Sequence, residues 1–200
     1  MSFNKELTLS ATMNLDFTQI QLNTPRLRLR PLRASDVEDM FDVYSDPKVM
    51  QYGSTPPWTS LEDARTSLSR TDVGMKEGQF LRLALTIGDS DHFIGDCCLF
   101  KFDQQCRHAE VGYSMGAAYW GQGYMHEALI ALLNYGFQTL NLNRIEADID
   151  PHNLASARCL EKLGFVKEGY LRERWIVDGV MSDSALYGLL RREWAHGSEG

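Results

Sequence analysis

The sequence predicts a mixed α/β fold, in which a central mixed, mostly antiparallel sheet carries helices on both faces. Three observations predict it. Apolar residues alternate in segments of strand length on both sides of a long segment with helical spacing. Short turns join the first strands, helices separate the later ones, and a hairpin closes the chain. The 200 residues are 44% apolar, which is enough for the core of one domain.

The first part of the chain alternates between strand and helix patterns. Leu27, Leu29 and Leu32 predict a first strand, which Pro31 places at a sheet edge because proline cannot donate a ladder hydrogen bond. Capping and turn residues bound the later elements. We expect a helix from Ser35-Asp36 to Asp46-Pro47, a helix from Thr59 or Ser60 to about Lys76, and strands over 80–87, 93–102 and 107–115, with residues 88–91 as the first turn between them.

The second part contains the clearest helix. Its apolar residues recur at i, i+3, i+4, i+7 and i+8 from Met125 to Leu140, which makes one stripe over four turns. Turn and cap signals bound the remaining elements. These are a strand over 144–150, a helix from its N-cap Asn153 to Leu163 that Gly164 ends, and a hairpin of residues 165–177 and 181–190 around Asp178-Gly179.

The chain divides into an N-terminal arm (residues 1–23), a single domain (24–194) and a C-terminal tail (195–200). The arm lacks the basic flank and apolar stretch of a signal peptide. No window approaches 18 uninterrupted apolar residues, so no transmembrane helix is expected. These features predict a cytoplasmic protein without a membrane partner.

Charge and cysteine content disfavour several classes of function. The net charge of −7, from 27 acidic and 20 basic residues, argues against nucleic acid as a partner, because phosphates bind basic surfaces. The four cysteines form no C-x-x-C pair, and no Cys/His cluster has zinc spacing, so no metal is expected. We interpret them as free thiols of a reducing cytoplasm.

Two glycines one residue apart precede the long helix. The segment reads Tyr119-Trp120-Gly121-Gln122-Gly123-Tyr124-Met125. Glycine lets the backbone turn tightly and approach a ligand, and the free amides of a helix N-terminus attract phosphate. The segment is neither a P-loop nor a dinucleotide fingerprint, because the P-loop spacing and the third glycine are absent. A pyrophosphate cradle and a plain tight turn both remain open.

The segment after the next strand makes the pattern specific. Residues 153–165 read N-x-x-S-x-x-x-L-x-K-x-G-F, and together with the G-x-G-Y before the long helix they resemble the GNAT acetyltransferase superfamily. The opening T-P-R-L-x-L-R-P-L (Thr24–Leu32) and the closing E-G-Y (Glu168–Tyr170) resemble its Rim-type branch, named for enzymes that acetylate the N-termini of ribosomal proteins. The resemblance covers roughly residues 24–194.

The resemblance implies a GNAT acyl-CoA N-acyltransferase fold that holds acetyl-CoA between two parallel strands, ending here near Met115 and Asp150. An amine attacks the thioester directly, so no cysteine needs a nucleophilic role. Trp120 and Met125 depart from the family loop [QR]-x-x-G-x-[GA], but backbone amides still supply phosphate binding. The implied cofactor contacts are Tyr113, Ser114, Met115, Trp120, Gly121, Gln122, Gly123, Tyr124, Met125, Asn153 and Ser156.

The resemblance also implies two catalytic residues. Glu110 is the candidate base, since the family often places a carboxylate on this strand that acts through water. The alternative is a surface carboxylate paired with Arg107 or Arg144. Ser156 is the candidate acid for the leaving thiolate, because the tyrosine that many members carry one turn later is Leu160 here. The alternative for Ser156 is a hydrogen bond to a nearby backbone amide.

We therefore predict transfer of an acetyl group from acetyl-CoA to a primary amine, the N-terminal α-amine of a protein of the ribosomal type. If Glu110 is not the base, Glu173 is the next candidate. Two other functions remain open: a polyamine or aminoglycoside N-acetyltransferase, and a non-catalytic acyl-CoA sensor, which the missing tyrosine allows. No motif identifies the acceptor, because loops determine it. A homodimer is compatible with the sequence, which does not determine the oligomeric state.

Overall fold

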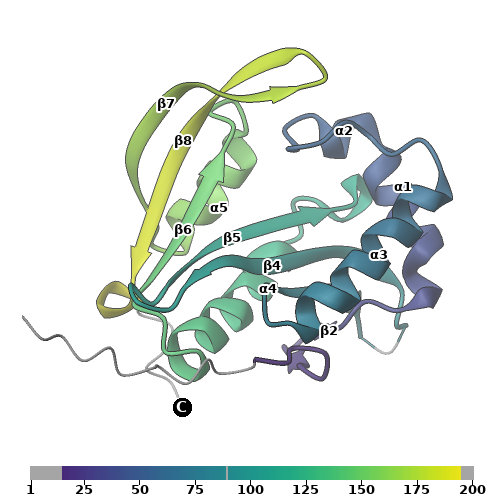
Figure 1. The fold of residues 1–200 in the computed structure, drawn as a ribbon, viewed down its shortest axis with the longest axis horizontal. Helices are drawn as coiled ribbons and strands as arrows, with labels where there is room; N and C mark the ends of the chain where they lie inside the picture. The colour runs from purple at the N-terminus through teal and green to yellow at the C-terminus, as the bar shows by residue number, and fades with distance from the viewer. Residues whose placement is uncertain (1–14, 89, 195–200) are drawn as a thin grey trace, which may run out of the picture.

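The protein, described by a computed structural model over residues 15–88 and 90–194, contains one eight-stranded sheet in that part of the chain. The strand order is β1-β2-β3-β4-β5-β6-β8-β7 (Figure 1). Every neighbouring pair is antiparallel except β5 and β6, so the predicted mixed, mostly antiparallel sheet is confirmed. The strands are β1 Leu22–Asn23, β2 Leu27–Arg30, β3 Leu81–Ile87, β4 Phe93–Asp103, β5 His108–Met115, β6 Arg144–Ile149, β7 Val166–Val177 and β8 Val180–Leu190.

Helices cover both faces of the sheet. In Figure 1, α1 and α3 lie in front of the sheet and α4 and α5 behind it. Short 3-10 turns at 34–36, 117–119 and 191–193 and a π-helical turn at 135–139 complete the described elements. The helices are α1 Val37–Ser45, α2 Pro47–Met50, α3 Leu61–Lys76, α4 Tyr124–Asn134 and α5 Leu154–Lys162.

Alternation along the strands creates two cores. In β3, Leu83 and Leu85 are fully buried in the core that α4 shares, whereas Ala84, between them, packs with α1 and α3 on the opposite face. The same period of two places Ala109 and Val111 of β5 in the core that α4 shares, and turns Glu110 to the α1 face. We call these the α4/α5 face and the α1/α3 face.

The long helix departs from its predicted course. The stripe from Met125 to Leu140 predicted a continuous α-helix, but α4 ends at Asn134 and a π-helical turn follows. Gly136 accounts for the change: a Cβ there would lie 3.1 Å from Ile145 Cδ1 and 3.2 Å from a Leu99 methyl. The wider π-helical turn buries both Gly136 and Phe137 against the sheet. A regular α-helical repeat of 3.6 residues does not predict such a turn.

The N-terminal region also differs from the expectation. β2 is not the edge strand that Pro31 suggested, because the short strand β1 lies outside it. Residues 15–23 of the expected arm contact the domain: Phe17 is 1% exposed, and its amide donates to the Met75 carbonyl at 3.0 Å. Residues 1–14, Asp89 of the expected turn and the expected tail at 195–200 lie outside the described residues. The division into arm, domain and tail stays a prediction.

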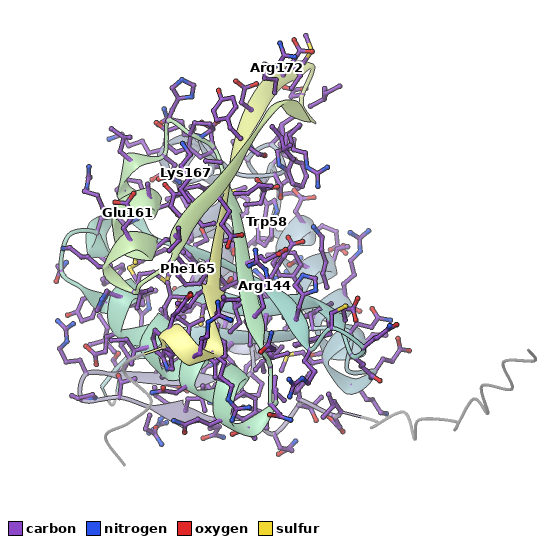
Figure 2. All side chains as sticks on the ribbon, turned by 90° about the vertical axis from the view of Figure 1, so that its left-hand side faces the viewer. Trp58, Arg144, Glu161, Phe165, Lys167 and Arg172 are labelled. Atoms are coloured by element: carbon purple, nitrogen blue, oxygen red, sulfur yellow. The ribbon has the colours of Figure 1, made fainter. Side chains whose placement is uncertain are left out.

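The closing hairpin forms as predicted. Asp178 and Gly179 both have positive φ, 49° and 76°, which suits a two-residue hairpin turn. β7 is the outer strand of the sheet and is exposed along most of its length. Figure 2 shows Arg172 towards the outer end of the hairpin, far from Arg144 of β6, which pairs with Leu190 at the other end of β8. No helix in the described ranges is both long and apolar enough to cross a membrane.

Candidate active site

The two parallel strands separate soon after they meet. Their ladder contains three residue pairs and ends with Glu110 of β5 opposite Glu146 of β6. Beyond this point β5 continues to Met115 beside β4 only, and Figure 1 shows β6 turning away from it. The edge of β5 at Tyr113 and Ser114 therefore has no strand partner, and its backbone groups are available to a ligand. The predicted opening between the strands is present.

The glycine loop connects the end of β5 to α4. Gly121 and Gly123 have φ of 74° and 80°, a conformation that suits glycine, and Gly123 is the N-cap of α4. Within the described residues the loop amides at 121–123 donate no backbone hydrogen bond, and the first amides of α4 have no intrahelical partner. Trp120 closes the loop by donating its indole N–H to the Met115 carbonyl at 2.7 Å. The geometry fits an anion such as a pyrophosphate.

A cluster that the sequence analysis missed supports this loop. The Glu127 carboxylate, in the first turn of α4, accepts from the Thr24 hydroxyl at 2.6 Å and from Arg26 Nε at 2.6 Å. Arg26 also donates to the Gln122 carbonyl at 2.9 Å. Burial raises the pKa of Glu127, but the hydrogen bonds from Thr24 and Arg26 outweigh it and hold the pKa below its ordinary value. The sequence did contain a signal for this cluster. It is the T-P-R triplet at residues 24–26, together with a glutamate, Glu127, in the first turn of the long helix.

A pair of hydroxyl groups lies on the α4/α5 face of the opening. The Tyr113 phenol oxygen is 2.6 Å from Ser156 Oγ, so β5 and the first turn of α5 are linked directly. Ser156 is 7% exposed, and its amide donates to Asn153 Oδ1 at 3.0 Å, which confirms Asn153 as the helix N-cap. Leu160, at the position of the absent tyrosine, is fully buried in the core.

Carboxylates lie on the α1/α3 face of the same opening. Both oxygens of Glu110 lie 2.8 Å from Lys101 Nζ. Its partner is therefore neither Arg107 nor Arg144, the two alternatives from sequence, because Arg144 pairs with Glu146 and Glu168 instead. Lys101 lies on a bulge of β4 with φ of 53°, a local irregularity that no sequence pattern indicated.

Asp148 of β6 is a second carboxylate that the sequence analysis did not single out. It lies two residues beyond the last ladder pair, on the face of Glu146, and its side chain is 11% exposed. Within the described residues its Oδ1 is buried without a hydrogen-bond partner, and its Oδ2 lies 3.8 Å from Arg174 Nε. Buried carboxylate oxygens without partners are rare, so this oxygen calls for a donor. The sequence pattern could have indicated Asp148, because it alternates with the apolar residues Ala147 and Ile149 of the predicted strand and so faces the side opposite to theirs.

A buried network forms the floor of the α1/α3 face. Arg82 of β3 donates to Asp96 of β4 at 2.7 Å, and Tyr44 of α1 donates to the same carboxylate oxygen at 2.7 Å. Asp96 is opposite Ser114 in the β4–β5 register. Burial, and then the Asp96 charge, raise the pKa of Tyr44 far above its ordinary value, so its phenol stays protonated. The network fixes α1 on β3 and β4, the strands next to β5, which borders the opening.

Comparison with known proteins agrees with this geometry. Residues 26–166 match the family model described as an acetyltransferase (GNAT) domain. The chain belongs to the GNAT family. Its architecture, with one parallel pair that separates beside a glycine-rich helix start, is therefore a GNAT fold, and the predicted class of enzyme, an N-acetyltransferase, is confirmed.

Individual GNAT relatives span most of the chain. An uncharacterized N-acetyltransferase, p20, of Bacillus licheniformis is 38% identical over 87% of this chain and 98% of its own. The ribosomal protein uS5 alanine N-acetyltransferase of Escherichia coli K12 is 29% identical over 90% of this chain and 95% of its own, in line with the predicted Rim-type resemblance. The solved spermidine N-acetyltransferase of Vibrio cholerae, with CoA and spermine, has a TM-score of 0.75 over 85% of this chain and 98% of its own, but at 22% identity it shows the fold alone.

The remaining residues considered in the sequence analysis add less to the description of the site. Glu173 is exposed on a bulge of β7, where its amide donates to Asp183 Oδ1 at 2.7 Å. Burial raises the pKa of the Cys159 thiol to about 11, so it is a poor nucleophile at neutral pH. Tyr124 and Met125 are half-buried, and Arg26 lies 4.6 Å from the centre of the Tyr124 ring. Met125 is thus compatible with the loop despite its size.

Proposed function

We propose that this protein transfers the acetyl group of acetyl-CoA to the N-terminal α-amine of a protein, by direct attack of the amine on the thioester. The observation that carries the proposal is the separation of β5 from β6 after three residue pairs, with hydroxyls on one face and carboxylates on the other. Acyl transfer from a thioester to an amine needs a proton acceptor on the side of the amine and hydrogen-bond donors on the side of the sulfur.

The cofactor side follows from the free backbone groups. The amides at 121–125 would bind the pyrophosphate, and the open edge of β5 at Tyr113 and Ser114 would bind the pantetheine arm. Asn153 combines its role as N-cap with a contact to the same arm. Ser156, buried at the start of α5, would donate a hydrogen bond to the departing sulfur.

The acceptor side favours a single amine over a polyamine. Each carboxylate on the α1/α3 face of the opening already faces a basic side chain of the protein itself. The pairs are Glu110–Lys101, Glu146–Arg144 and Asp148–Arg174. A chain of several ammonium groups would find these charges compensated, whereas one amine needs a single acceptor. An α-amine of pKa about 8 is neutral roughly one time in ten at pH 7, so it also demands less of a base than a lysine, neutral about once in 2,500.

The experiment is thiol release from acetyl-CoA with matched acceptors. A peptide with a free N-terminal alanine or serine and one internal lysine is compared with the same peptide carrying a blocked N-terminus, and with spermidine and an aminoglycoside. We expect turnover with the free peptide alone. Turnover with the blocked peptide would point to lysine acetylation, and turnover with spermidine or the aminoglycoside to a small-molecule enzyme. CoA binding without turnover on any acceptor would favour the sensor.

A further inference from the structure

The hydroxyl pair on the α4/α5 face has a feature that the proposed role of Ser156, as hydrogen-bond donor to the sulfur, does not use. A serine hydroxyl has one hydrogen and two acceptor lone pairs. If Ser156 directs its hydrogen to the sulfur of the thioester, its oxygen must accept from another donor or remain unsatisfied in a buried place. Tyr113 Oη, 2.6 Å away, is suited to supply that hydrogen.

No other side chain in the described residues makes a hydrogen bond to Ser156 Oγ. Asn153 Oδ1 is occupied by the Ser156 amide at 3.0 Å and has no hydrogen to give. The position one turn along α5 is Leu160, an apolar side chain in the core. Tyr113 reaches the site from β5, on the same face as Val111 and Met115, and so comes from a different element.

We propose that Tyr113 is a positioning residue that donates its phenol hydrogen to Ser156 Oγ and thereby directs the Ser156 hydrogen to the thioester sulfur. This inference rests on the proposed acetyl transfer. In the step, the amine nitrogen forms a bond to the acetyl carbon, the carbon–sulfur bond breaks, and the sulfur keeps the electron pair as a thiolate. The thiolate accepts a hydrogen bond from Ser156, and the proton that the amine loses goes to a carboxylate of the α1/α3 face. Both hydroxyls keep their protons.

The environment of Tyr113 keeps the phenol hydrogen that this donation needs. Burial raises the pKa of the Tyr113 phenol well above its ordinary value, so the group stays protonated through the neutral and mildly alkaline range. Hydrogen bonds in a chain polarise one another, so a donor behind Ser156 makes the serine a better donor to the sulfur. α5 has Leu160 where many family members carry a tyrosine. In this proposal Tyr113 of β5 supplies a tyrosine hydroxyl instead, and it acts on the sulfur through Ser156.

A double-mutant cycle tests the inference. Tyr113→Phe should lower kcat about tenfold and leave the KM for acetyl-CoA within twofold, since only a hydroxyl is lost; Ser156→Ala should lower kcat on the order of 100-fold. The double variant should be no slower than Ser156→Ala, because the phenol acts through the serine. Tyr187→Phe is the matched control: it removes another hydroxyl facing α5, 3.5 Å from Glu161 Oε1, and should change kcat less than twofold.

Other outcomes overturn the inference in distinguishable ways. Full activity of Tyr113→Phe, or additive losses in the double variant, would reject the positioning role while the proposed function stands. An inert wild-type enzyme with every acceptor would reject the function and the inference together. Should Tyr113→Phe not fold, 4-fluorophenylalanine at position 113 keeps a substituent of similar size at the ring end but has no hydrogen to donate. The kcat should then fall about tenfold with the acetyl-CoA KM unchanged, and an unchanged kcat would contradict the proposal.

Discussion

The two faces of the opening between β5 and β6 are built differently. On the α4/α5 face the polar groups satisfy one another: Tyr113 with Ser156, Asn153 with the amide of Ser156, and Glu127 with Arg26. On the α1/α3 face Asp148 Oδ1 has no partner in the described residues, and Glu110 is held by Lys101, which is half-exposed.

The difference teaches which substrate each face serves. Groups already hydrogen-bonded in the free protein are held in place before the substrate arrives, which suits a cofactor that never changes. A buried oxygen without a partner, beside ion pairs that can rearrange, suits an acceptor whose amine completes the site on binding. Four tests, with five variants, probe this comparison, from the largest expected effect to the smallest.

The first variant is Ser156→Ala, on the α4/α5 face, which we propose binds the cofactor. Turnover should fall on the order of 100-fold at saturating peptide, with the acetyl-CoA affinity unchanged, because only a donor to the leaving thiolate is lost. The loss should be the same factor from pH 6.5 to 9.5, since a serine does not titrate in this range. A pH–rate profile beside that of the wild type measures it, and overlapping profiles would leave Ser156 as a helix-turn residue.

The second variant, Gly123→Val, tests whether the loop binds the cofactor. Its φ of 80° strains any residue with a Cβ, so the loop would have to move; the nearest atom to the new Cβ, Arg26 Nη2, lies at 3.4 Å. Losing one charged hydrogen bond to the pyrophosphate would raise the acetyl-CoA KM roughly 10- to 150-fold. Gly179→Val is the control, since it places the same side chain at φ of 76° in a remote turn. Unchanged acetyl-CoA affinity in Gly123→Val would reject the cradle.

The third comparison, Glu110→Gln against Asp148→Asn, divides the roles on the amine face. If Glu110 is the base, its variant should lose about tenfold at pH 7 and recover as rising pH supplies neutral amine, earlier for an α-amine than for a lysine. Asp148→Asn should instead raise the acceptor KM at every pH. The measurement is kcat and KM for a peptide from pH 6.5 to 9.5. If the activity of Asp148→Asn recovers with rising pH and that of Glu110→Gln does not, the base is Asp148 and not Glu110.

The fourth variant, Glu127→Gln, should cost about 1–2 kcal/mol of stability, or a few degrees of melting temperature, at pH 7. The folded-state pKa of Glu127 is lowered, so its charge stabilises the fold above the unfolded pKa of about 4.3, and that stability is lost as the pH falls through the folded value. The gap in melting temperature should therefore close below about pH 4. Glu62→Gln, in an exposed pair with Arg65, is the control that should change little. A gap that persists in acid would mean that the Glu127 charge is not the cause.

The sequence predicted the parts of this site that depend on local pattern. The predicted strand over 107–115 contains both Glu110 and Tyr113, and the predicted N-cap Asn153 places Ser156 in the first turn of α5. What it could not predict depends on the meeting of distant segments. The partner of Glu110 is set by a bulge in β4, and the partner of Ser156 by the distance between β5 and α5. The π-helical turn at 135–139 was missed because tight packing at Gly136 overrides helical periodicity.

The short ladder between β5 and β6 also has a consequence for cooperativity. It divides the backbone hydrogen bonding of the sheet into a unit of five strands and a unit of three, joined by three residue pairs. Local opening events follow the borders of such units, so the amides of β6 should exchange with solvent sooner than those of β3 or β4. A ligand lying across that border links the two units, and at 100 times its dissociation constant it adds about 2.7 kcal/mol to the stability of the whole. If acetyl-CoA binds across this border as proposed, it also cross-links the two units of the sheet.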